Sequence, residues 1–114
     1  MKNFRQFIDE TIEFSDDLDR NVTIIMGDNG SGKTTIAQAF SWCLYCSTDF
    51  NDNILINRKV ANEMAIGSDE EVKTELVLQH GGIDYTIILL RENFRRIPLH
   101  TFQFKPKFCV CLFR

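Results

Sequence analysis

The chain has 114 residues, of which 44% are hydrophobic and 25% charged, as expected for one globular domain. The formal net charge of -3 argues against a uniformly basic surface for nucleic acid, and no apolar run approaches the roughly 20 residues that span a bilayer. The polar N-terminus also lacks the apolar stretch of a secretory signal. We therefore expect a cytoplasmic protein with no membrane partner, in which the cysteines are reduced thiols.

Strand patterns occupy the first part of the chain. Two short alternating runs, Phe4–Ile8 and Thr11–Phe14, flank the polar pair Asp9 and Glu10, and this pattern predicts a β-hairpin. After a charged loop, Val22–Met26 is apolar and β-branched almost throughout. Such a run predicts a strand buried on both faces of a parallel sheet.

A helix is predicted from about Lys33 to Tyr45, because apolar residues recur there at helical spacing. Cys43 belongs to this stripe, which favours a small core residue over a zinc ligand shared with Cys46, Cys109 and Cys111. The stripe consists of Ile36, Ala39, Phe40, Cys43 and Leu44. The polar segment that follows, Cys46 to Glu70, is predicted to be a loop with at most one short helix.

A second hairpin is predicted between Val72 and Leu90. Apolar and polar residues alternate up to His80, and β-favouring residues resume at Ile83. Gly81 and Gly82 between them tolerate the positive φ angles of a two-residue turn.

The residues from about 91 to 114 differ in composition from the rest. From Phe94 onward the chain is rich in phenylalanine, contains both prolines and has no acid, and neither helical nor strand periodicity fits it cleanly. An out-of-frame read-through would produce such a change. A genuine basic and aromatic extension, able to stack on single-stranded nucleic acid or to dock a partner, is the alternative.

Between the predicted strand and the helix lies "GDNGSGKT", Gly27 to Thr34, which satisfies the phosphate-loop pattern. Gly27, Gly30 and Gly32 let the backbone turn tightly and approach an anion without a Cβ in the way. The successive N–H groups from Asn29 to Thr35, including that of Ser31, are then expected to point toward a phosphate, reinforced by the positive end of the helix.

Side chains of the same stretch are predicted to complete the site. Lys33 is expected to place its ammonium on the β- and γ-phosphates of ATP, and the Thr34 hydroxyl to coordinate Mg²⁺. Thr35 is a further candidate phosphate contact. The alternative is a glycine-rich turn that binds nothing, which the setting between a strand and a helix makes the weaker interpretation.

At these residues the sequence resembles the N-terminal head segment of the SbcC, RecF and SMC-type ATPases, ABC-like enzymes of DNA repair and chromosome maintenance. The matching stretches run from about Asn3 to Leu90. The most specific is the loop "NGSGKTT" joined to the helix "AQAFSWCLY". The others are "NFRQF", "IEFS", "NVTIIM", "LIN" and "ELVLQHGGIDYTI".

The resemblance implies an α/β fold, a P-loop NTPase of the ABC/SMC-head type represented by its N-terminal lobe only. Residues 1–90 would form this lobe, with antiparallel hairpins flanking the strand, loop and helix. Residues 91–114 lie outside the resemblance and are expected to be an atypical basic and aromatic tail, either out of frame or disordered. The resemblance also implies a missing C-terminal lobe, a second head as dimer partner, and DNA as a partner of the full protein. Arg5 matches a family arginine that lies near the nucleotide. The alternative interpretation is that Arg5 is a solvated strand residue without a role in binding.

The sequence also departs from that family. The acidic Walker B pair, the signature motif and the glutamine of the second lobe have no counterpart in these 114 residues. Lys33 would stabilise transition-state charge only in an assembled head, and hydrolysis by this chain alone is not expected. Cys46 stands where the family favours glycine after the helix, which predicts strain at the helix end.

Two other functional interpretations stay open. The chain could be a non-functional truncated fragment whose apolar strand edges are exposed. It could also be a small P-loop nucleotide kinase or GTPase-like protein, although the Asn-Lys-x-Asp motif of GTPases is absent from the sequence.

Overall fold

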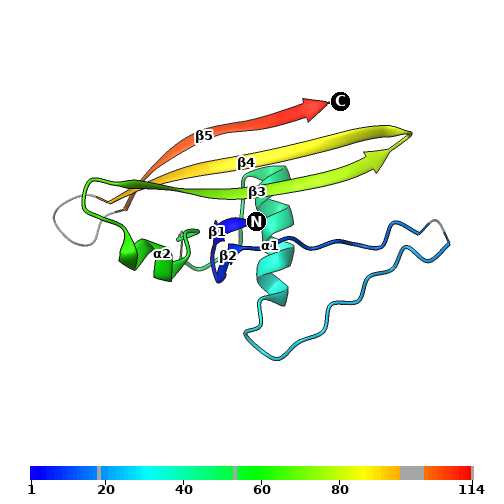
Figure 1. The fold of residues 1–114 in the computed structure, drawn as a ribbon, viewed down its shortest axis with the longest axis horizontal. Helices are drawn as coiled ribbons and strands as arrows, with labels where there is room; N and C mark the ends of the chain where they lie inside the picture. The colour runs from blue at the N-terminus through cyan, green and yellow to red at the C-terminus, as the bar shows by residue number, and fades with distance from the viewer. Residues whose placement is uncertain (18, 53, 96–101, 114) are drawn as a thin grey trace.

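The computed structural model describes residues 1–17, 19–52, 54–95 and 102–113, with 94–95 and 102–113 described by their backbone. Its strands form one sheet in the order β2-β1-β3-β4-β5, and every pair in it is antiparallel. The elements in chain order are β1 (Lys2–Phe4), β2 (Phe7–Asp9), α1 (Lys33–Tyr45), α2 (Arg58–Glu63), β3 (Asp69–His80), β4 (Ile83–Arg95) and β5 (Phe102–Phe113) (Figure 1).

The long hairpin of β3 and β4 confirms the prediction for Val72 to Leu90. The two strands pair continuously from Asp69 opposite Phe94 to His80 opposite Ile83. Gly81 and Gly82 form the turn with φ angles of 60° and 76°, a conformation in which a Cβ would be strained. The two-glycine turn and the alternation of apolar and polar residues are thus consistent with the same strand register.

Strand β5 was not predicted from the sequence. It pairs with β4 along its length, with a bulge where Leu89 lies opposite Cys109 and Leu90 opposite Lys107. Pro106 lies within β5, a position that proline can occupy because β5 is an edge strand of the sheet. The division of the chain at residue 90 stays a prediction.

The first hairpin exists, but the predicted strand boundaries were wrong. Phe4 pairs with Phe7, so the turn falls at Arg5 and Gln6 inside the first alternating run, and Thr11–Phe14 is not a strand. Tertiary contacts explain the difference. Phe4 is fully buried, and the Arg5 backbone, with a φ of 54°, donates a 2.7 Å hydrogen bond to the carbonyl oxygen of Leu55.

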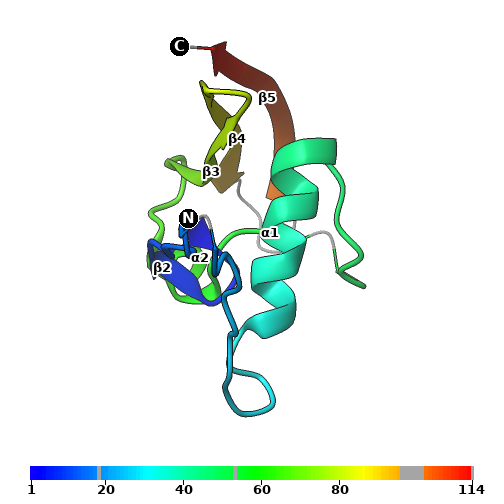
Figure 2. The ribbon, with the colours of Figure 1, turned by 90° about the vertical axis from the view of Figure 1, so that its right-hand side faces the viewer.

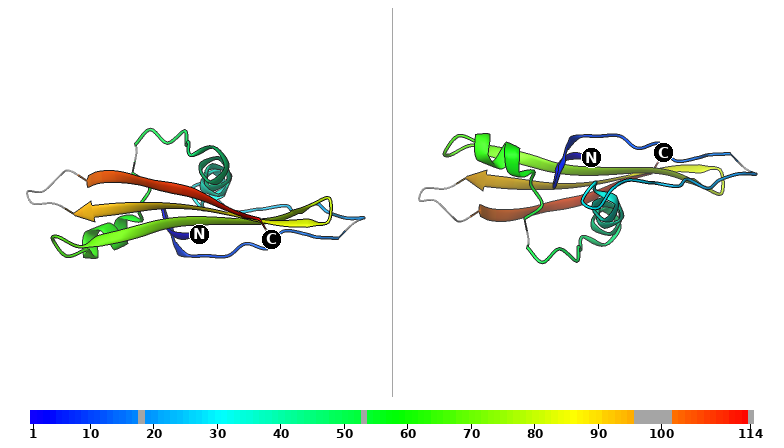
Figure 3. Two further views of the ribbon diagram at one scale, coloured as in Figure 1. Left: turned by 90° about the horizontal axis from the view of Figure 1, so that it is seen from above. Right: turned by 90° about the horizontal axis from the view of Figure 1, so that it is seen from below.

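The prediction of a buried parallel strand at Val22–Met26 was also wrong. This segment is in no strand, and its apolar side chains are exposed, with Ile24 at 78% and Met26 at 87%. A strand buried on both faces needs a neighbour on each side. Within the described residues every strand pair is antiparallel and none includes this segment, which lies in a long loop extending toward the same end of the molecule as the β3–β4 turn (Figure 3).

Helix α1 has the predicted bounds, but its buried stripe is rotated from the predicted one. Thr35, Ala39, Trp42 and Cys43 are buried, whereas Leu44 is exposed. The rotation follows from what α1 packs against. It contacts β3 and β4 and lies beside the N-terminal hairpin (Figure 2). The Trp42 ring of α1 stacks on the Phe4 ring of that hairpin, with centroids 5.3 Å apart.

Cys43 is a core residue, as the sequence predicted. It is 1% exposed, and its Sγ donates to the carbonyl oxygen of Ile87 in β4 at 3.4 Å. The buried apolar core lies between α1, the first hairpin, α2 and the long strands. It comprises Phe4, Ala39, Trp42, Cys43, Leu55, Ile56, Ala61, Met64, Val72 and Leu89.

The one short helix expected between Cys46 and Glu70 is α2. The Asn57 side chain caps it by accepting from the N–H groups of Lys59 and Val60. The Asn57 backbone N–H donates to the carbonyl oxygen of Asn3 at 2.8 Å, which attaches the start of α2 to β1. In the described chain, neither helix has the length and apolar character needed to cross a membrane.

Candidate functional site

The glycine-rich loop leads directly into α1. Gly30 and Gly32 have φ angles of 86° and 104°, so both occupy conformations that favour glycine. Within the loop the Ser31 N–H donates to the carbonyl oxygen of Asp28 at 3.2 Å. Gly27 approaches Ser31 so closely that a Cβ on Gly27 would lie 2.6 Å from the Ser31 hydroxyl oxygen. The loop therefore has the tight backbone that its sequence predicted.

The N-terminus of α1 offers hydrogen-bond donors. Gly32 is the N-cap residue and has no side chain to accept from the first N–H groups of the helix. Its carbonyl oxygen accepts the first helical bond, from Ile36, at 2.9 Å. The first turn, which begins at Lys33, contains no acidic residue to neutralise the positive end of the helix dipole. This end of α1 is electrostatically suited to an anion.

Lys33 folds back over the loop. Its ammonium donates to the carbonyl oxygens of Gly27 at 2.6 Å and Asp28 at 2.7 Å, and the residue is exposed. The charge is therefore bonded to two backbone carbonyl groups of the loop in an exposed residue.

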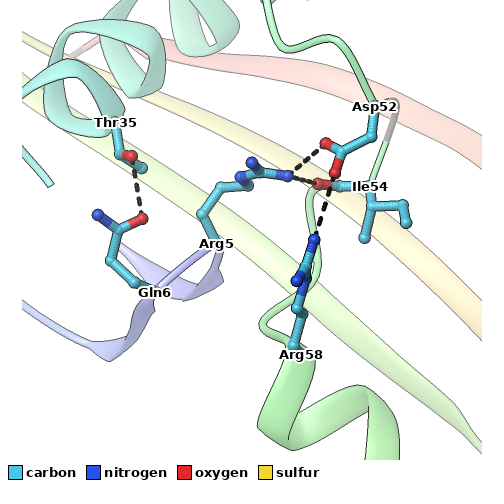
Figure 4. Close-up of polar contacts among 6 residues, drawn as sticks. All are labelled: Arg5, Gln6, Thr35, Asp52, Ile54 and Arg58. Carbon is cyan, nitrogen blue, oxygen red and sulfur yellow. Dashed lines mark hydrogen bonds and ion pairs between the residues drawn. The ribbon is translucent and has the colours of Figure 1, made fainter. Parts of the chain in front are cut away.

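The two threonines of the loop face different surroundings. Thr34 is exposed, as a residue that coordinates a metal ion next to a bound phosphate needs to be. Thr35 is 7% exposed, and its hydroxyl donates to the Gln6 side-chain oxygen at 2.9 Å (Figure 4). In this structure the Thr35 hydroxyl is therefore directed toward the first hairpin.

Arg5 is not a freely solvated strand residue. Its guanidinium forms an ion pair with Asp52, donates to the carbonyl oxygen of Ile54 at 2.7 Å and lies 4.3 Å from the centre of the Phe50 ring. Asp52 also lies 3.7 Å from the guanidinium of Arg58 (Figure 4). Arg5 thus joins the first hairpin to the segment between α1 and α2.

Gln6, the neighbour of Arg5, packs against Gly32, whereas the Arg5 side chain bonds to Asp52 and to the Ile54 carbonyl oxygen. Sequence reasoning missed both Gln6 and Asp52. Gln6 lies within the matching stretch "NFRQF", but nothing in the sequence indicates that it contacts residues almost thirty positions later. Asp52 is one acid in a polar segment, and only the fold identifies its partner.

The chemistry of this site fits Mg²⁺ bound together with a nucleotide. Among the described residues, no group of three or more histidine, cysteine, aspartate or glutamate side chains could hold a metal ion. Mg²⁺ commonly binds through few protein ligands, with phosphate oxygens and water completing its shell. Thr34, which is exposed, is the residue of the loop expected to supply such a ligand.

Comparison with known proteins agrees with the early resemblance. The sequence matches the family described as AAA domain over residues 1–106. It is 31% identical over 87 residues to a DNA double-strand break repair Rad50 ATPase from Halobacterium salinarum, and 49% identical over 43 residues to a DNA replication and repair protein RecF from Acetivibrio thermocellus. These matches confirm the resemblance to the N-terminal head segment of SbcC, RecF and SMC-type ATPases.

The matches cover little of either relative. The aligned stretches are 76% and 38% of this chain but only 9% of the Rad50 ATPase and 11% of RecF, respectively. This chain therefore spans about a tenth of the length of these curated relatives. No solved structure matches it significantly.

Proposed function

Since the chain belongs to the AAA domain family, we propose that the loop from Gly27 to Thr34 is a Walker A phosphate loop that binds Mg-ATP. The observation that carries this proposal is the Lys33 ammonium folded over a loop that leads into an uncapped helix N-terminus. The loop and the helix end thus supply a cationic donor and N–H donors, which is the chemistry that recognises a polyphosphate.

Each residue has a distinct part in binding. The N–H groups from Asn29 to Thr35 would surround the phosphate oxygens, with the Ser31 N–H giving up its bond to Asp28. The Lys33 ammonium would exchange its two carbonyl partners for the β- and γ-phosphates. Thr34 would hold Mg²⁺, which neutralises phosphate charge. Arg5 would lie near the nucleotide at the side of the first hairpin.

We further propose that the chain serves as the N-terminal lobe of an ABC/SMC-type head in an ATPase of DNA repair or maintenance. The names of its two relatives, a break-repair ATPase and a replication and repair protein, support this role. The exposed apolar segment Val22–Met26 also supports this proposal, because a further lobe would cover its apolar side chains. A second head and DNA would be partners of the assembled protein.

Binding without appreciable hydrolysis is the expected behaviour of these 114 residues, because they contain no counterpart of the Walker B acid that orients water. The test is titration of the purified chain with Mg-ATP by calorimetry. Lys33→Ala should weaken binding by about 10-fold or more, since hydrogen bonds to charged groups each contribute roughly 1.5–3 kcal/mol.

Lys59→Ala is the matched control, because Lys59 is an exposed lysine of α2 away from the loop. It should bind Mg-ATP as the parent chain does. Equal affinity of the parent chain and Lys33→Ala would contradict nucleotide binding through this loop. Precipitation of the parent chain before titration would instead favour the interpretation as an incomplete fragment.

A further inference from the structure

The first hairpin packs directly on the phosphate loop. A Cβ added to Gly32 would lie 2.5 Å from the Gln6 side-chain nitrogen and 2.7 Å from the tip of the Phe7 ring. Gly32 is itself buried, although the neighbouring loop residues are exposed. The turn of the hairpin therefore closes one side of the N-cap of α1, which is the point where the loop backbone enters the helix.

Gln6 makes a second contact with the same helix end. Its side-chain oxygen accepts the Thr35 hydroxyl at 2.9 Å, and Thr35 is a buried residue of the first turn of α1 (Figure 4). Gln6 thus touches the residue before the helix and bonds to a residue of its first turn. The Gln6 side chain therefore contacts the residues on either side of Lys33 and Thr34.

The turn that carries Gln6 is fixed independently of the loop. The Arg5 backbone N–H donates to the Leu55 carbonyl oxygen, and the Arg5 side chain bonds to Asp52 and to the Ile54 carbonyl oxygen. Phe4, which precedes Arg5, is fully buried in the core. Because these contacts hold the hairpin turn in place, the contacts of Gln6 restrict the conformation of the loop more than that of the hairpin.

We propose that Gln6 is a positioning residue of the phosphate loop, and that Thr35 serves the site through its hydrogen bond to Gln6 rather than by a side-chain contact with phosphate. This inference rests on the proposed function and assigns a role to a residue outside the loop motif. It also changes the part expected of Thr35. Thr35 was expected from the sequence to contact phosphate, whereas in this proposal its hydroxyl stabilises the conformation of the loop.

A double-mutant cycle on the whole chain tests the proposal. Gln6→Ala and Thr35→Val each remove one partner of the hydrogen bond, and each should weaken Mg-ATP binding by about 3- to 10-fold. The variant carrying both substitutions should lose no more than either single variant, because both remove the same interaction. Thr35→Ser, which retains the hydroxyl, should recover most of the Mg-ATP affinity that Thr35→Val loses.

Gln38→Ala is the matched control. Gln38 lies on the same helix and bonds through its side chain to Asp49, away from the loop. This variant should leave Mg-ATP affinity unchanged. If the losses of the two single variants multiply in the double variant, or if either single variant binds normally, the proposal is overturned.

A measurement without nucleotide separates this proposal from the proposed function. In the free protein, Gln6→Ala should shift the amide resonances of Gly32 and Lys33, whereas Gln38→Ala should leave them in place. Unshifted resonances in Gln6→Ala would overturn the positioning role even if Mg-ATP binds. Absence of Mg-ATP binding by the parent chain would overturn the proposed function, and the amide shifts would still decide whether Gln6 sets the loop conformation.

Discussion

Cys46 ends α1 in a conformation that residues with a Cβ rarely adopt. Its φ and ψ angles are 56° and 22°, and its N–H donates to the Trp42 carbonyl oxygen at 2.9 Å. Glycine is common at such a position because it occupies the left-handed region without steric cost. The cysteine side chain is exposed and contributes no burial in return.

Cys46→Gly should therefore raise the free energy of unfolding by about 1 kcal/mol, through relief of the left-handed strain. Urea unfolding followed by circular dichroism measures the change. Cys46→Ala is the control, since it removes the thiol but keeps the Cβ, and it should give no comparable gain. A gain of the same size in both variants would indicate that the thiol, rather than the backbone, is responsible.

At the scale of elements, α2 depends on its cap. The helix has six residues, too few to be stable alone, and the Asn57 side chain accepts from two of its first N–H groups. Asn57→Ala should lower the free energy of unfolding by about 1 kcal/mol. Chemical denaturation of the variant provides the measurement.

Asn57→Ser separates capping from burial in that experiment. Serine retains a side-chain acceptor that suits an N-cap position, and it should restore part of the lost stability. If Asn57→Ser is as destabilised as Asn57→Ala, then packing of the buried Asn57 side chain, rather than the cap, accounts for the effect.

Elements with strong local signals were predictable from the sequence. The two glycines at positions 81 and 82 set the register of the long hairpin, and the periodic apolar residues set the bounds of α1. The turn at Arg5 was not predictable, because contacts with residues some fifty positions away stabilise it. The contact of Gln6 with Thr35 was not predictable for the same reason, whereas the loop itself contains a recognisable motif.

For the molecule as a whole, the exposed apolar segment Val22–Met26 is the main feature that differs from the sequence prediction. Ile24→Lys should leave the free energy of unfolding within about 0.5 kcal/mol of the parent value, because the Ile24 side chain is 78% exposed. It should also reduce self-association, since an exposed apolar segment favours contacts between molecules.

Thermal unfolding and light scattering at matched concentrations measure these two effects. Thr23→Lys serves as a control for added charge, because it alters the neighbouring residue without removing apolar surface. A loss of several kcal/mol in Ile24→Lys would show that Ile24 is buried in the folded chain, as the sequence pattern predicted.

The position of β1 inside the sheet has a consequence for biosynthesis. Asn3 in β1 donates through its side chain to the Glu71 carbonyl oxygen in β3, a contact that joins residues 68 positions apart. At the usual rates of ribosomal elongation, about 3 to 14 seconds separate the synthesis of these two strands. During that interval the nascent chain carries Phe4, and later Trp42, without the long strands that complete the core, and only the first hairpin, α1 and the segment through α2 precede β3.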